Sequence, residues 1–193
     1  VNDEKIGKNK SKENKELISR KLLKEGNYSY EQALEELFNF KNLNSGPCGK
    51  LIHKSLFKED LRFPRIHTYE DLLFVYKVIY KSKNIYFIEN CKYYYIHRSG
   101  VGAMDKFIKN PTTDVIIAAH EVLEFIKKNV PNIWDSSFYG MISQVIMYIN
   151  DINKIDYKWQ KESSKIYIEE TRNLLVKYRK EIRENKSIFF KEK

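Results

Sequence analysis

The strongest constraint on the fold is a run of nine residues from Leu72 to Tyr80, in which Lys77 is the only side chain that is neither apolar nor aromatic. The residues around this run predict a helix from Thr68 to Lys81. A helix that is apolar almost all round has to be covered on several sides. We therefore expect further amphipathic elements to surround it in a shared core.

Two helices are expected before the apolar run. Leucine and isoleucine residues at helical spacing in residues 17–23 predict a short helix that ends at Gly26. The spacing of Ser29 and Gln32 is that of a capping box, which predicts that a longer helix begins there and continues through Phe38.

Two short segments after the apolar run have strand composition. Residues 85–88 and 93–98 are rich in isoleucine, tyrosine and phenylalanine, and residues 89–92 form a tight connection between them. We expect two short strands, with Tyr93 and Tyr95 on one face and Tyr94 on the other. The predicted fold class is therefore mainly α with one small β-element.

The chain after Pro111 has helical patterns throughout. They predict helices at about 112–128, 133–150 and 157–185, the first closed by Asn129 and Pro131. The expected apolar side of the last helix consists of Ile166, Leu174, Leu175, Tyr178 and Ile182.

The charge balance leaves two kinds of partner open. Among the 193 residues, 35 are Lys or Arg and 26 are Asp or Glu, which gives a net charge of +9. Such a charge is compatible with a basic helical module that binds nucleic acid or an anionic membrane surface. Acidic residues alternate with basic ones in the last helix, which favours a solvated, ion-paired face over a nucleic-acid groove.

The cysteines and most of the histidines suggest no site. Cys48 and Cys91 are too few for a disulfide framework, which favours a reducing compartment, and we interpret both as small buried apolar side chains. His53, His67 and His120 have no partner at metal-ligand spacing, so we interpret them as structural or surface residues.

Two positions have the composition of a catalytic or binding site. Glu70 and Asp71 begin the apolar helix, where Asp71 can either complete a capping box with Thr68 or serve as a general base. His97 and Arg98 end the second predicted strand, where they can meet a phosphate or lie in solvent.

The order of several short motifs resembles bacterial family 2 glycosyltransferases, which build capsule and lipopolysaccharide chains. The matching pieces are residues 47–57, Leu61-Arg62-Phe63-Pro64, Tyr69-Glu70-Asp71 and Tyr93-Tyr94-Tyr95-Ile96-His97-Arg98. Together they span about residues 46–98. Cys48-Gly49 stands where the family has Trp-Asn, and Ile96 replaces an arginine.

The resemblance implies a role for each candidate residue. Asp71 would be the catalytic base that takes the proton of an acceptor hydroxyl, and Glu70 would orient Asp71 or the acceptor. Lys50 would support the acceptor wall, while His97 and Arg98 would lie near the diphosphate of the donor. No Asp-x-Asp motif for a divalent metal occurs in the chain.

The resemblance also implies a division of the chain. Residues 1–28 would be a flexible or partly helical lead-in, 29–105 the acceptor-side part of a glycosyltransferase domain, and 106–193 a C-terminal helical extension. The whole would be the C-terminal part of an α/β glycosyltransferase A-type fold. The donor-binding half would lie upstream of Val1, so that this chain alone would be inactive and would hold no metal.

The expected partners follow from this implied reaction. They are a nucleotide-sugar donor, a saccharide or lipid-linked acceptor and, in the full-length enzyme, Mg²⁺ or Mn²⁺, with no nucleic acid. The implied location is the cytoplasm or the cytoplasmic face of the membrane, compatible with peripheral membrane contact. Self-association through an exposed strand edge is a further alternative, in which the chain is a structural partner domain.

Overall fold

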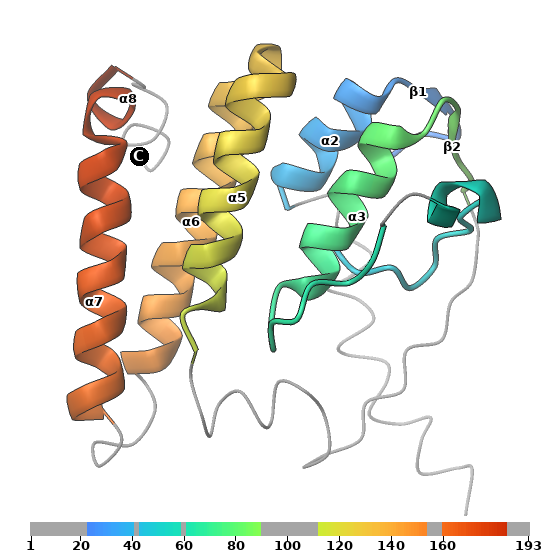
Figure 1. Cartoon of the computed structure of the whole chain (residues 1–193). Coiled ribbons are helices and arrows are strands. Elements are labelled where there is room, and N and C mark those ends of the chain that lie inside the picture. The colour runs from blue at the N-terminus through green and yellow to red at the C-terminus, as the bar shows by residue number, and fades with distance from the viewer. Residues whose placement is uncertain (1–22, 41–42, 59–60, 90–111, 154–159, 185–193) are drawn as a thin grey trace, which may run out of the picture.

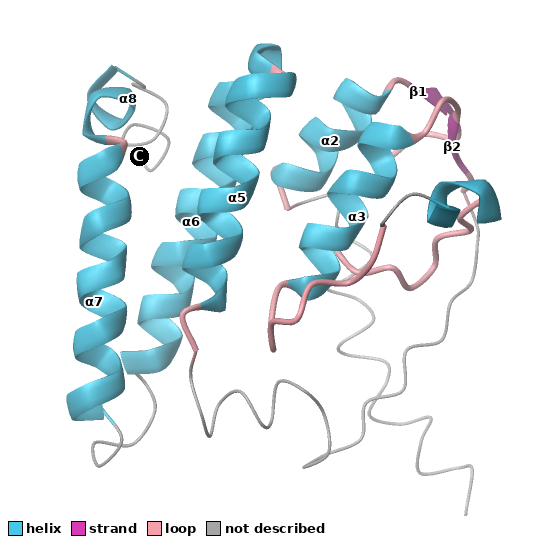
Figure 2. Cartoon of the chain, in the orientation of Figure 1, coloured by secondary structure: helices cyan, strands magenta, loops and turns pink. Residues whose placement is uncertain are grey.

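The computed structural model describes residues 23–40, 43–58, 61–89, 112–153 and 160–184. Within these ranges the protein is mainly helical, with one small antiparallel sheet, as the sequence predicts (Figure 2). Helices α2 and α3 form one pair, α5 and α6 form the next, and α7 lies on the far side of α6 (Figure 1). None of the helices in these ranges is long and apolar enough to cross a membrane.

Helix α2 (Tyr30–Phe38) begins at the predicted capping box. The Ser29 hydroxyl accepts the N–H of Gln32, and the Gln32 side chain accepts the N–H of Ser29. Both interactions join residues three apart, so the local sequence is sufficient to specify them. The helix buries Ala33, Leu34, Leu37 and Phe38.

Helix α3 (Glu70–Lys81) is the predicted apolar helix, and its burial is confirmed. Seven of its twelve residues are buried: Leu72, Leu73, Phe74, Val75, Tyr76, Val78 and Ile79. It packs against α2 and α5, while the rings of Phe57 and Phe63 stack on Phe74. Phe57 belongs to the short 3-10 helix η1 (Lys54–Lys58).

The sheet differs from the predicted hairpin. Strand β2 (Ile85–Phe87) lies in the predicted segment, but it pairs antiparallel with β1 (Gly26–Tyr28). The helix expected to end at Gly26 is wrong over its last described residues, because residues 23–25 are not helical and the strand begins at Gly26. The second predicted strand, 93–98, and residues 17–22 lie outside the described residues. Strand pairing over some 60 residues leaves little local signal in a three-residue segment.

The C-terminal part confirms three predicted helical regions and corrects their details. Helix α5 is Asp114–Asn129, the 3-10 helix η2 is Pro131–Ile133 and α6 is Trp134–Asn153. The single helix expected at 157–185 is instead α7 (Gln160–Lys177) followed by α8 (Arg179–Glu184).

The predicted apolar side of the last helix is confirmed except at Ile166: Leu174 and Tyr178 are buried, and Leu175 and Ile182 pack partly buried against the core. Ile166 is 58% exposed, whereas Tyr167, Thr171, Leu174 and Tyr178 are buried. These four residues are spaced by four, three and four positions, which places them on one side of the helix. The buried side therefore includes Thr171, which the apolar pattern omitted.

Gly140 allows α6 to approach the end of α2. A Cβ atom built at Gly140 would overlap the backbone carbonyl of Phe38. The backbone of α6 therefore contacts the backbone of α2 where only a glycine fits. This contact joins the first pair of helices to the second within one core.

Candidate active site at the start of helix α3

The turn before α3 is organised by a distant carboxylate. Asp114, the first residue of α5, is buried, and its Oδ2 accepts the backbone N–H groups of His67 at 2.7 Å and Thr68 at 3.0 Å. Tyr69 then adopts a left-handed conformation, with φ of 63°, and α3 begins at Glu70. Two donors of the turn are thus satisfied by α5.

Of the two alternatives for Asp71, the capping box with Thr68 is wrong. Thr68 is not the N-cap, and its hydroxyl is buried without a hydrogen-bond partner among the described residues. Asp71 instead accepts the N–H of its neighbour Leu72 through Oδ1, at 2.7 Å. The local pattern fails here because Asp114, more than forty residues later, holds the backbone in a different turn.

The second carboxylate oxygen of Asp71 faces the loop 43–50. A Cβ atom at Gly46 would lie 3.5 Å from Oδ2 of Asp71 and 3.1 Å from Oδ1 of Asn44, so Oδ2 of Asp71 lies close to the backbone of this loop. Asp71 itself is half-buried. One oxygen of Asp71 is thus fixed by the backbone, while the other lies beside a residue without a side chain.

The side chain of Lys50 hydrogen-bonds to two backbone carbonyls of the loop 43–50. Its Nζ donates to the carbonyl of Asn44 at 2.6 Å and also to the carbonyl of Gly46. Burial lowers the pKa of Lys50, and the nearby Asp71 carboxylate opposes this shift. Lys50 and Asp71, matched separately by the resemblance, therefore interact in the folded chain.

Glu70, the first residue of α3, precedes Asp71 and is half-buried. Burial raises the pKa of Glu70 above the usual range of a glutamate, and the Asp71 and Asp114 carboxylates raise it further. Backbone hydrogen bonds at Glu70 and Asp71 lower the pKa and partly oppose this effect. Glu70 therefore holds a proton more readily than an exposed glutamate, a property often found at catalytic sites.

The other candidate residues contribute less to this site. His97, Arg98 and Cys91 lie outside the described residues. Cys48 is exposed, so the interpretation as a buried apolar side chain is wrong for it, because the loop 43–50 turns it toward solvent. His53 is exposed and hydrogen-bonds to Ser55, in line with a surface role.

No group of three histidine, cysteine, aspartate or glutamate side chains that could hold a metal occurs among the described residues. The half-buried ammonium of Lys50, on which the Asp71 carboxylate acts electrostatically, also disfavours a second cation at this position. The cluster does not fit a divalent metal, so no metal enters the chemistry derived below.

Reasoning from the sequence missed two residues that shape the site. Asp114 follows two threonines at a helix start, where an acidic residue usually interacts with its own helix. Gly46 precedes a proline and is typical of a turn. Only their three-dimensional neighbours, the turn before α3 and Asp71, indicate their contribution to the site.

Comparisons with known proteins do not assign the chain. No protein-family model, no curated protein and no solved structure matches it.

Proposed function

We propose that this chain carries the acceptor side of a glycosyltransferase of surface polysaccharide biosynthesis. The observation that supports the proposal best is the environment of Asp71. Its Oδ1 accepts the N–H of Leu72, and its Oδ2 faces the loop that contains Gly46 and Lys50. A carboxylate held in one orientation, with a second oxygen able to accept a proton, is suited to general base catalysis.

In the proposed reaction, the hydroxyl of a saccharide or lipid-linked acceptor gives its proton to Oδ2 of Asp71. The hydroxyl oxygen forms a bond to the anomeric carbon of a nucleotide-sugar. The bond from that carbon to the diphosphate breaks, and the nucleoside diphosphate leaves with the electron pair. Inversion at the anomeric carbon follows from attack opposite the leaving group.

The neighbouring residues would position Asp71 and the acceptor. Glu70, with its raised pKa, would donate a hydrogen bond to an acceptor oxygen when protonated. Lys50 would hold the wall of the loop 43–50 through the carbonyls of Asn44 and Gly46. By the resemblance alone, His97 and Arg98 would contact the donor diphosphate.

The donor-binding part and its Mg²⁺ or Mn²⁺ would belong to a preceding part of the parent protein. We propose that the sugar transfer takes place in the cytoplasm or at the cytoplasmic face of the membrane. It also implies that the 193 residues do not transfer sugar by themselves.

The test is an Asp71→Asn substitution in the parent protein, with release of nucleoside diphosphate as the measurement. We expect the transfer rate to fall by about 10²–10⁴-fold, the usual contribution of a general base. Donor affinity should change by less than about twofold, because Asp71 would contact the acceptor.

The matched control is Glu35→Gln, which removes one negative charge from an exposed position on α2 and should leave transfer unchanged. Retained transfer in the Asp71→Asn protein would contradict the proposal. Micromolar binding of a nucleotide-sugar by the 193 residues alone would contradict the acceptor-side assignment.

A nucleic-acid-binding module receives less support from the described residues. Lys177 pairs with Glu124 at 2.8 Å, and Lys127 pairs with Glu181 at 2.9 Å. Lysines bound to neighbouring carboxylates are less available to neutralise phosphates. We therefore do not propose nucleic acid as the partner.

A further inference from the structure

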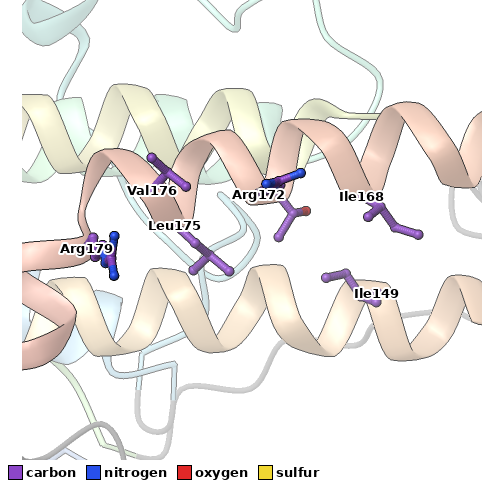
Figure 3. Close-up of a pocket in the computed structure, with 7 residues that line it drawn as sticks. Ile149, Ile168, Arg172, Leu175, Val176 and Arg179 are labelled. Carbon is purple, nitrogen blue, oxygen red and sulfur yellow. The ribbon is translucent and has the colours of Figure 1, made fainter.

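A shallow apolar hollow lies between α6 and α7, far along the chain from Asp71. Its volume is about 520 Å³, and its lining consists of Ile149, Ile168, Thr171, Arg172, Leu175, Val176 and Arg179. Ile149 of α6 and Leu175 of α7 lie in the gap between the two helices (Figure 3). Ile168 and Val176 are 58% and 62% exposed, so the hollow opens onto a surface with aliphatic side chains.

The charges at this hollow are of one sign. Arg172 and Arg179 belong to the lining, which contains no acidic residue. No ion pair joins either arginine to a carboxylate among the described side chains, although Glu169 lies three residues before Arg172. The two arginines are seven residues apart, about 10 Å along the axis if the helix ran on without a break.

We propose that this hollow docks onto the surface of a bilayer that contains anionic phospholipids. Ile168 and Val176 would enter the boundary between headgroups and acyl chains, while Arg172 and Arg179 would contact lipid phosphates. Surface-lying helices bind membranes through this combination of an apolar face with adjacent basic residues. The bilayer is contacted at its surface and is not crossed.

Charge complementarity favours an anionic lipid surface over a second copy of the chain. A two-fold contact between copies would place the same patch on itself and would bring Arg172 and Arg179 close to their counterparts. The segment after α8, residues 185–193, contains three lysines and one glutamate, so it does not complement the arginines either.

The side chains at the hollow also favour lipid over single-stranded nucleic acid. Such nucleic acids bind surfaces on which bases stack on aromatic rings. The lining of the hollow contains aliphatic residues and no aromatic residue. Lipid chains, in contrast, are accommodated by aliphatic side chains. The inference rests on this surface alone and does not depend on glycosyl transfer.

The experiment measures binding of the chain to vesicles by flotation. One set of vesicles contains phosphatidylcholine with phosphatidylglycerol, and the other contains phosphatidylcholine alone. We expect binding to the anionic vesicles only, and a double Arg172→Gln, Arg179→Gln variant should bind about 25-fold more weakly, from about fivefold per basic residue. A double Ile168→Ser, Val176→Ser variant should lose the binding that persists at high salt.

The matched control is a Lys83→Gln, Lys128→Gln variant, which removes two positive charges at exposed positions away from the hollow. It should bind within about twofold of the unchanged chain, because electrostatic attraction to the membrane decays within a Debye length. Circular dichroism of every variant establishes that the helices are retained.

Three results would overturn the inference. The first is equal binding to both kinds of vesicle, or to neither. The second is an equal loss in the arginine and lysine double variants, which would indicate net charge alone. The third is a dimer in sedimentation that the isoleucine and valine substitutions dissociate, without any effect on vesicle binding.

Discussion

Charged side chains are held differently in the two parts of the molecule. Near the start of α3, Lys50 and Asp114 bind backbone groups: the ammonium donates to two carbonyls and the carboxylate accepts two N–H groups. Between α5 and the C-terminal helices, Lys127 and Lys177 bind carboxylates at the surface.

This difference has consequences for stability and for function. A charged side chain that satisfies backbone groups, as the buried Asp114 does, is costly to remove, because the backbone groups then remain without partners. A surface ion pair contributes little, because water replaces either partner. The backbone hydrogen bonds of Lys50 and Asp114 keep the turn and loop around Asp71 in one conformation. The surface ion pairs of the C-terminal helices tolerate substitution, so side chains on that surface can be used for binding.

The largest effect is expected where the two parts meet, at Gly140. Gly140→Ala would force α6 away from the Phe38 carbonyl and open the core between the two helix pairs. We expect a loss of stability at or above the upper end of the usual overpacking range, about 3 kcal/mol. Chemical denaturation measures it, with Ser143→Ala at a half-buried position on the same helix as the control. A loss below about 1 kcal/mol for Gly140→Ala would show that the helices can separate without disturbing the core.

The next largest effect is expected for Asp114→Ala. This change leaves the N–H groups of His67 and Thr68 without their acceptor, and each buried unsatisfied group costs about 1–3 kcal/mol. We expect a loss of about 3 kcal/mol in the free energy of unfolding. Thr113→Ala, which removes a side chain without a capping hydrogen bond, should change stability by less than about 0.5 kcal/mol. Similar losses in the two variants would refute the special role of Asp114.

The burial of Tyr167 in the C-terminal part should make the free energy of unfolding depend on pH in alkaline solution. Burial raises the pKa of Tyr167, so the folded chain keeps this proton while the unfolded chain releases it above about pH 10. Stability should therefore fall with rising pH above that value, by about 1.4 kcal/mol per pH unit for this tyrosine. Urea denaturation at several pH values measures the slope, which should be smaller by that amount in Tyr167→Phe. An unchanged slope would mean that Tyr167 is accessible to water.

The smallest effect is expected for the surface ion pair of Lys177. Its Nζ contacts Glu124 with 47% and 56% of the two side chains exposed. Lys177→Met should cost about 0.2–1 kcal/mol, and added salt should reduce the difference. Lys165→Met on the exposed side of α7 is the control. A loss of stability in Lys177→Met as large as that in Asp114→Ala would contradict the proposed difference between surface ion pairs and charges bound to the backbone.

Features that depend on neighbouring residues were predicted well from the sequence. The capping box of Ser29 and Gln32 and the burial of α3 are both found, because each follows from residues within one or two helical turns. The pairing of β1 with β2 and the turn fixed by Asp114 were missed, because their partners lie some 46 to 61 residues away.

The roles chosen for Lys50, Glu70 and Asp71 stay predictions. The Asp71 carboxylate acts electrostatically on Lys50 in the folded chain, but a catalytic role of either residue is a proposal. The capping-box alternative for Asp71 is wrong, because Asp114 binds the backbone of the preceding turn and Thr68 is not the N-cap. His97 and Arg98 stay predictions, since they lie outside the described residues.

The link made by Asp114 has a mechanical consequence. It ties the first residue of α5 to the turn that precedes Asp71 by one short side chain, across more than forty residues of sequence. A rotation or shift of α5 would therefore be transmitted to that turn as a rigid displacement. A load applied to the C-terminal helices, such as contact with a surface, would reach the turn before Asp71 through this carboxylate, in addition to the packing of α5 against α3.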